Sequence, residues 1–277
     1  MSDHKASRTA LGTAYLRAAH QLFETRPRIL DDPVALSLLG PAALQRIKDT
    51  ADHYRTPEGL ALRAHVVLRS RFAEDRLAAA VLRGITQYVI LGAGFDTFAL
   101  RQPPWAQALK IFEVDHPGTQ TMKRSHLAAA GLAMPQNTAF ADIDFEHESL
   151  LDGLLRYHVS MDEPTFFSWL GVTMYLKEDA IDAVLRSVAT FPAGSEIVLT
   201  FVRPPGDSPS PLARRTAGLG EPWVSYFEPD VLEVKLRGLG FARVEFLSPE
   251  EAEVRYFRQH PEDLPVPKQT NILCAVL

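Results

Sequence analysis

Apolar residues recur at helical spacing along the first 85 residues of the chain. Over residues 9–24 they follow one another at intervals of three and four, which is typical of a helix with one buried face. Asp32 followed by proline is typical of an N-cap and a first helical position, so a short helix is expected over residues 33–39. Residues 57–83 have the pattern of one long helix, which Gly84 is placed to end. A helical N-terminal region is therefore predicted.

From residue 87 onwards the pattern changes to short apolar runs separated by helical stretches. The runs that predict strands cover residues 88–91, 109–114, 138–141, 165–170 and 197–202. The helical stretches between them cover residues 118–130, 148–157 and 177–190. Such alternation predicts βαβ units, and hence a parallel sheet with right-handed crossovers.

The C-terminal part of the chain adds one predicted helix and two predicted strands. The helix covers residues 230–237 and is ended by Gly238. The strands cover residues 242–246 and 271–276 and fit a hairpin-like pair that closes the sheet. The count of predicted strands is therefore seven.

A proline-rich loop over residues 203–211 is a candidate linker, but too little chain follows it for an independent core. We therefore expect one domain over residues 1–277 with a doubly wound, Rossmann-like α/β fold. Within it we expect a helical N-terminal extension or lid over residues 1–85 and a core over residues 86–277.

Composition and charge narrow the class of protein. Of the 277 residues 46% are hydrophobic and 23% are charged, and the net charge is −5. The chain therefore lacks the excess of basic residues that is typical of nucleic-acid-binding proteins. No stretch approaches the 18 consecutive apolar residues of a membrane span. Residues 1–8 lack the apolar segment of a signal peptide, and Cys274 has no second cysteine to pair with. We expect a cytoplasmic protein with a small-molecule or protein partner, and no nucleic-acid or membrane partner.

The first candidate site is a glycine turn after the first predicted strand. The run over residues 90–97 reads Ile-Leu-Gly-Ala-Gly-Phe-Asp-Thr, in which Gly92 and Gly94 allow a sharp turn and a close approach of a ligand to the backbone. A dinucleotide fingerprint would have a third glycine where Thr97 stands, which weakens the prediction of NAD binding. A tight strand-to-helix turn without a ligand is the plain structural alternative.

An acidic residue at the end of the second predicted strand strengthens the prediction of a ligand site. Asp115 lies 21 residues after Gly94, at the distance where an acid reaches ribose hydroxyls in a doubly wound sheet. Glu113 lies on the same strand face, so the sequence does not choose between the two acids. Asp115 also stands where it would cap a helix that starts near Pro117. An adenosine-type ligand is the predicted occupant.

At these residues the chain resembles the leucine carboxyl methyltransferase family, and more closely its bacterial branch associated with polyketide-type O-methyltransferases. The resemblance covers most of the chain and rests on short motifs in a shared order, at residues 17–18, 32–33, 69–72, 88–97, 101, 113–117, 144–145, 171–176, 219–223, 240–241 and 255–256. It implies a class I fold, with a seven-stranded sheet whose last strand is antiparallel. It also implies S-adenosyl-L-methionine as the cofactor.

The resemblance implies residue roles by position. The methionine end of the cofactor would lie at Gly92, Ala93 and Gly94, with the ribose on Asp115. An acidic–apolar pair, Asp144 and Phe145, would flank the adenine. The cofactor carboxylate would be held by Arg69, with Arg71 and Arg17 as the alternatives, because a guanidinium binds a carboxylate in bidentate fashion.

One position departs from the family pattern. Many relatives carry Glu before the Gly-Val segment, where this chain has Leu170. We expect the cofactor amino group to be held instead by the Leu170 carbonyl or by the glycine turn. The departure keeps open a non-catalytic, cofactor-binding or regulatory protein as an alternative.

The acceptor decides which catalytic residues are needed. A carboxylate is already ionised at pH 7 and needs no base, whereas a hydroxyl does, and His116 and Tyr175 are the candidates. The acceptor pocket is expected to be lined by Met174, Tyr175, Trp223, Tyr226 and Phe227. We expect a small-molecule O-methyltransferase without a metal, because the histidines lack metal-ligand spacing. A nicotinamide-dependent oxidoreductase is the other alternative, and the oligomeric state stays open.

Overall fold

Seven strands in the described part of the chain form one sheet, in the order β3-β2-β1-β4-β5-β7-β6. The computed structural model describes residues 6–206, 208, 210–259 and 263–277. The strands are β1 (Gln87–Leu91), β2 (Lys110–Asp115), β3 (Thr138–Asp142), β4 (Thr165–Trp169), β5 (Glu196–Thr200), β6 (Arg243–Phe246) and β7 (Ile272–Val276). Strand β1 pairs in parallel with β2 and β4, and β7 runs antiparallel to β5 and β6. The predicted α/β sheet with a reversed last strand is confirmed.

The helices are α1 (Arg8–Phe23), α2 (Pro33–Asp49), α3 (Ala51–Arg55), α4 (Pro57–Leu82), α5 (Pro117–Ala129), α6 (Leu150–Arg156), α7 (Glu178–Val188), α8 (Pro211–Gly218), α9 (Pro229–Gly238) and α10 (Pro249–Ala252). Short 3-10 turns cover Phe98–Leu100, Pro104–Ala106 and Thr173–Tyr175, and a π turn covers Glu253–Phe257. The sequence did not predict α3, α8 or α10. Parts of two sequence features, residues 1–5 of the polar N-terminus and positions 207 and 209 of the proline-rich loop, lie outside the described residues.

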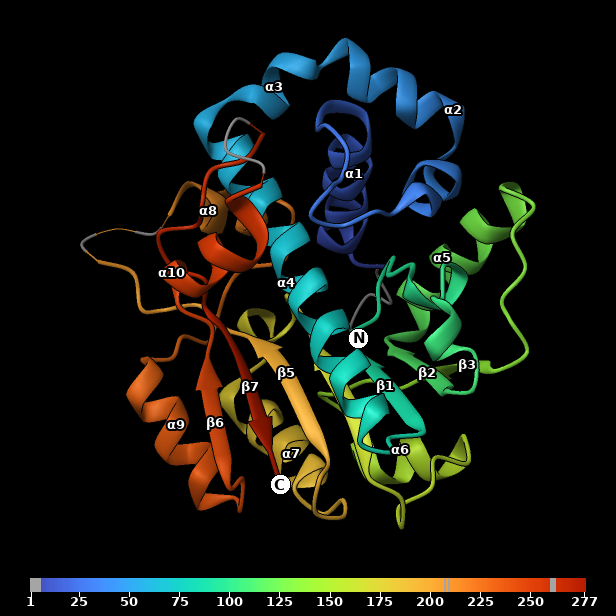
Figure 1. The fold of residues 1–277 in the computed structure, drawn as a ribbon, viewed down its shortest axis with the longest axis vertical. Coiled ribbons are helices and arrows are strands. Elements are labelled where there is room, and N and C mark those ends of the chain that lie inside the picture. The colour runs from blue at the N-terminus through green and yellow to red at the C-terminus, as the bar shows by residue number, and fades with distance from the viewer. Residues whose placement is uncertain (1–5, 207, 209, 260–262) are drawn as a thin grey trace.

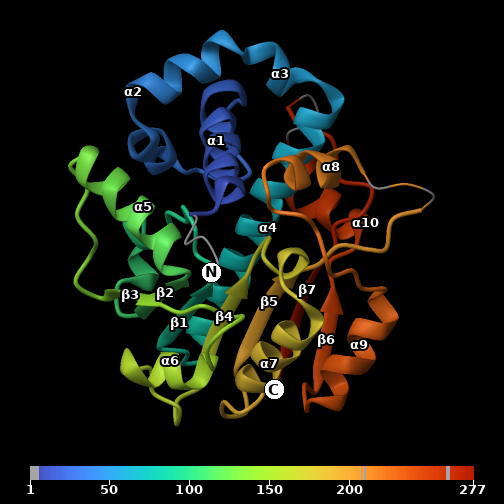
Figure 2. The ribbon, with the colours of Figure 1, turned by 180° about the vertical axis from the view of Figure 1, so that it is seen from behind.

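Each face of the sheet carries its own core, because successive side chains of a strand point to opposite faces. Tyr88 and Ile90 of β1 lie in the core beneath α4. Val89 and Leu91 lie in the core beneath α6, α7 and α9. Figures 1 and 2 show these two helical layers from opposite sides. The central strands β1, β4 and β5 are buried along their whole length, as expected where both faces of a sheet are covered.

The N-terminal helices α1, α2 and α3 lie beyond the carboxyl ends of the parallel strands (Figure 1). Helix α4 then runs from this group down along the sheet, so it belongs to both parts of the molecule. The predicted end of the second helix near residue 39 is a kink: Gly40 has φ +78°, and the helix resumes at Pro41 and continues to residue 49. Among the described residues, no helix is long and apolar enough to cross a membrane.

Candidate cofactor and acceptor site

The glycine turn lies where the sequence placed it, directly after β1 at the carboxyl edge of the sheet. Gly92 and Gly94 both have positive φ, of +67° and +50°, which disfavours residues with a side chain. A Cβ at Gly92 would collide with Val172, and one at Gly94 would lie 3.0 Å from the Cβ of Ala10 in α1. The turn is therefore packed closely between the segment after β4 and the first helix.

Asp115 ends β2 with its carboxylate against this turn. Its Oδ2 accepts a hydrogen bond from Gly94 N at 2.5 Å, and its Oδ1 accepts one from His116 N at 2.7 Å. Burial raises the pKa of the Asp115 carboxyl, and the two backbone N–H groups oppose that shift. The carboxylate can accept further hydrogen bonds, because its two oxygens offer about four lone-pair directions.

The other acid of this strand, Glu113, is already engaged. Its side chain is fully buried and lies 2.5 Å from Nζ of Lys123 on α5. The helix cap that Asp115 might have supplied comes instead from His116, whose Nδ1 accepts a hydrogen bond from Gly118 N at 3.1 Å. Both alternatives for Asp115 that the sequence left open are thus resolved by geometry, and Asp115 is the acid at the strand end.

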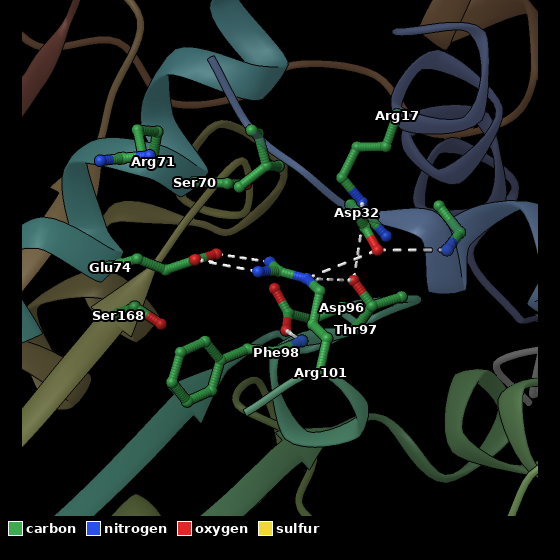
Figure 3. Close-up of polar contacts among 12 residues, drawn as sticks. Arg17, Asp32, Ser70, Arg71, Glu74, Asp96, Thr97, Phe98, Arg101 and Ser168 are labelled. Carbon is green, nitrogen blue, oxygen red and sulfur yellow. Dashed lines mark hydrogen bonds and ion pairs between the residues drawn. The ribbon is translucent and has the colours of Figure 1, made fainter. Parts of the chain in front are cut away.

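A buried polar network joins the N-terminal helices to the glycine turn (Figure 3). Asp32, at the start of α2, accepts hydrogen bonds from Arg17 Nε at 3.0 Å and from Thr97 Oγ1 at 2.7 Å. Arg101 Nε lies 3.4 Å from Asp32, and its Nη1 donates to Glu74 of α4 at 2.9 Å. Asp32 therefore does more than the predicted capping, which its Oδ1 performs for Ala35 N.

Two of the three candidate arginines for the cofactor carboxylate already have partners. Arg17 pairs with Asp32 and also donates to the carbonyl of Phe95. Arg71 Nε lies 2.8 Å from Asp75, and its side chain is 44% exposed. Figure 3 shows Arg71 turned away from the Asp32 network. Both guanidiniums are therefore already paired with a carboxylate of the protein.

Arg69 differs from both, since no carboxylate of the described residues lies within 4 Å of its partly buried guanidinium. The group lies against the backbone of Gly171, where a Cβ would collide with it. Burial lowers the pKa of Arg69 to about 10, Arg17 adds to this, and Tyr175 and Asp96 oppose it. A partly buried cation with no carboxylate in contact is costly, so this position is suited to an anionic ligand group.

The loop after β3 brings the predicted adenine-flanking residues to the same edge. Asp144 Oδ2 lies 2.8 Å from His147 Nδ1 and 3.7 Å from His116 Nε2. The Phe145 ring meets Trp169 edge-on, with centroids 6.3 Å apart. Phe145 also lines a cleft of about 450 Å³ between this loop and the start of α7. Both ring nitrogens of His116 thus face protein groups, and its catalytic role stays a prediction.

Leu170 and the expected acceptor-pocket residues follow β4 or lie in the segment after α8. Leu170 is partly buried and packs against the core beneath α4. Met174 and Phe227 are buried, whereas three aromatic residues of the predicted pocket are partly exposed, namely Tyr175, Trp223 and Tyr226. The Trp223 indole Nε1 is buried with no hydrogen-bond partner in the described structure.

Sequence reasoning missed two residues at this edge. The Glu221 carboxylate caps α1, accepting hydrogen bonds from Arg8 N at 2.6 Å and Thr9 N at 3.2 Å. Its motif, Leu-Gly-Glu-Pro-Trp over residues 219–223, is part of the family resemblance, which implies no role for this residue. The second residue is His65, four residues before Arg69 on α4. That spacing places the two side chains on one helical face and was readable from the sequence.

The fold and this edge together define a Rossmann-like α/β protein of the methyltransferase type. The crystal structure of a putative methyltransferase from Thermobifida fusca YX has a TM-score of 0.55 at 21% identity, covering 92% of this chain and 94% of that one. A DUF574 family protein from Streptomyces avermitilis MA-4680 also has a TM-score of 0.55, at 19% identity, covering 93% and 98%.

The chain belongs to the leucine carboxyl methyltransferase family, whose model matches residues 10–189. Among its relatives is YktD of Bacillus subtilis (strain 168), named a putative S-adenosyl-L-methionine-dependent methyltransferase. The two are 30% identical over 304 aligned residues, covering 100% of this chain and 99% of YktD. A Parafrankia sp. (strain EAN1pec) protein with the same named activity is 32% identical over 219 residues, covering 77% of this chain and 69% of that protein.

Proposed function

We propose that this chain is an S-adenosyl-L-methionine-dependent methyltransferase that methylates an oxygen of a small molecule, such as a polyketide-like metabolite. The observation that carries the proposal is the partly buried Arg69 guanidinium, which has no carboxylate within 4 Å among the described residues and lies against Gly171, just after the end of β4. The cofactor carries a carboxylate that would supply this charge. The family and the names of its members support methyl transfer as the reaction.

The residues of this edge fit the chemical groups of the cofactor. Arg69 would hold its carboxylate, and the free acceptor directions of Asp115 would take the ribose hydroxyls. Asp144 and Phe145 would flank the adenine at the neighbouring strand end. Since Leu170 offers no carboxylate, backbone carbonyls would hold the amino group. No metal ligand is needed, and the described residues contain no cluster that would hold a metal ion.

Methyl transfer from this cofactor requires the protein to position the acceptor more than to supply reactive groups. The bound cofactor supplies an electrophilic methyl group on a sulfonium. The chain contributes alignment of the acceptor oxygen with that methyl and exclusion of water, which the N-terminal helices beyond the strand ends are placed to do. Such positioning can lower a barrier by about 7–11 kcal/mol.

The two alternatives have less support. For a nicotinamide oxidoreductase, Thr97 stands where the fingerprint has glycine, and its hydroxyl is committed to Asp32. A non-catalytic cofactor-binding protein rests on Leu170 alone. Methyl transfer to a panel of phenols and carboxylic acids, followed with isotopically labelled cofactor, distinguishes that protein from an enzyme.

Arg69→Gln is the variant that tests the proposed carboxylate contact. We expect it to weaken binding of S-adenosylhomocysteine about 10- to 100-fold, because a charge-assisted hydrogen bond contributes about 1.5–3 kcal/mol. Arg71→Gln is the matched control, since that side chain lies two residues along the same helix but is exposed and paired with Asp75. Equal affinity of the wild type and Arg69→Gln would refute the assignment.

A further inference from the structure

One face of α4 carries a stripe of residues at intervals of four: His65, Arg69, Ala73 and Leu77. The later half of the stripe is apolar, and Ala73 and Leu77 are buried in the core against the sheet. The earlier half is polar and only partly buried. Since Arg69 already lies beside Gly171, after the end of β4, His65 stands one helical turn further from the sheet.

His65 differs from most other histidines at this edge in having no protein partner. No hydrogen bond or ion pair to its ring occurs within the described residues, whereas His116 and His147 both face Asp144. Burial lowers the pKa of His65 to about 3, and the positive charge of Arg69 adds to the shift. The imidazole is therefore neutral at pH 7, with one nitrogen lone pair and one N–H left for a ligand.

We propose that His65 is the catalytic base of the methyl transfer and that the acceptor group is a neutral hydroxyl, phenolic or alcoholic. This inference rests on the proposed function. The acceptor oxygen forms a bond to the methyl carbon while the carbon–sulfur bond breaks and its electron pair stays on sulfur. The hydroxyl proton passes to the ring nitrogen of His65 and is later released to water. A carboxylate acceptor would have no proton for this group to take.

The basicity of His65 depends on whether the charge of Arg69 is paired. In the free protein the Arg69 charge opposes protonation of His65. When the cofactor carboxylate pairs with Arg69, that opposition is offset, so the imidazole becomes more basic in the loaded enzyme. Binding of the cofactor would thereby raise the pKa of His65.

The first test measures the ring itself and needs no acceptor. In full-length protein with isotopically labelled histidine, the His65 resonances are assigned by their loss in His65→Gln. We expect them to report a neutral ring from pH 5.5 to pH 9. Arg69→Gln and, separately, saturating S-adenosylhomocysteine should each raise the pKa of His65. Bound S-adenosylhomocysteine that leaves the pKa of His65 unchanged would overturn the proposal. Absence of S-adenosylhomocysteine binding would instead refute the proposed function.

The second test measures catalysis with phenols and matched benzoic acids as acceptors. His65→Gln should lower kcat for a phenol about 10²- to 10⁴-fold, as expected for loss of a general base, with S-adenosylhomocysteine affinity within threefold of wild type. His53→Gln is the control, because that histidine is exposed on α3 and contacts Arg215. Methylation of benzoic acids alone, or loss of kcat in His116→Gln but not in His65→Gln, would overturn the proposal.

Discussion

Substitution of Asp32 tests most directly how the polar network stabilises the packing of the N-terminal helices against the glycine turn. Its carboxylate is fully buried and accepts hydrogen bonds from Arg17, Thr97 and the backbone of Ala35. Arg101 Nε lies 3.4 Å away. The substitution Asp32→Ala removes every one of these acceptors and leaves Arg17 without its carboxylate partner, whereas Arg101 keeps Glu74.

The expected loss in free energy of unfolding can be estimated from the contacts of Asp32. Two hydrogen bonds that involve the charged carboxylate contribute about 1.5–3 kcal/mol each, and loss of an N-cap costs about 1 kcal/mol. Removing one partner of a buried ion pair costs about 3–5 kcal/mol overall. We expect Asp32→Ala to lower the free energy of unfolding by about 3–5 kcal/mol. Asp32→Asn should lose less, because it keeps an acceptor for Ala35 N.

Urea denaturation followed by circular dichroism measures this loss, as a lower midpoint with an unchanged slope. Asp31→Ala is the matched control: it removes the same charge from the adjacent residue, whose side chain is 62% exposed and lies 3.6 Å from Arg28. That control should change stability by less than about 0.5 kcal/mol. If the two alanine variants unfolded at the same urea concentration, Asp32 would not be the buried hub described.

Three further predictions follow from single contacts. Gly171→Ala should displace Arg69 and so weaken S-adenosylhomocysteine binding, which calorimetry measures. Gly194 also has positive φ, but a Cβ there would meet no atom within 4 Å. Gly194→Ala should therefore lower only the stability, which denaturation measures. Glu221→Ala should speed amide hydrogen exchange in residues 8–12, because it removes the cap of α1. The control is Glu228→Ala, since Glu228 is the N-cap of α9 but makes no side-chain capping bond. Unchanged exchange in residues 8–12 of Glu221→Ala would contradict the prediction. Burial raises the pKa of the Cys274 thiol to about 12, so it should not react with a disulfide reagent at pH 8 until urea unfolds the protein; fast reaction of the native protein would show an open C-terminal strand.

Most of the sheet could be predicted from the sequence, because buried parallel strands are short apolar runs between helical stretches. The short helices α3, α8 and α10 could not, because five, eight and four residues are too few to establish a helical period. The extension of α2 past Gly40 was missed for a related reason. A glycine followed by proline ends most helical patterns, and here it produces a kink.

The sequence indicated where along the chain the candidate site residues lie, but not which protein groups they contact. Arg69 stood out from Arg71 and Arg17 only once their carboxylates were known, although Asp75, four residues after Arg71, was a readable sign of a local ion pair. The choice of Asp115 over Glu113 depended on Lys123, which reaches Glu113 from a different element. Partners that lie far away along the chain leave no local pattern in the sequence.

Isothermal titration of the full chain with S-adenosylhomocysteine, and separately with NAD⁺, tests most directly whether this edge of the sheet holds the proposed cofactor. Saturable one-to-one binding of S-adenosylhomocysteine, lost or strongly weakened in Asp115→Ala, with no heat from NAD⁺, is the predicted result. Absence of binding at millimolar S-adenosylhomocysteine, or saturable binding of NAD⁺ in its place, would contradict it.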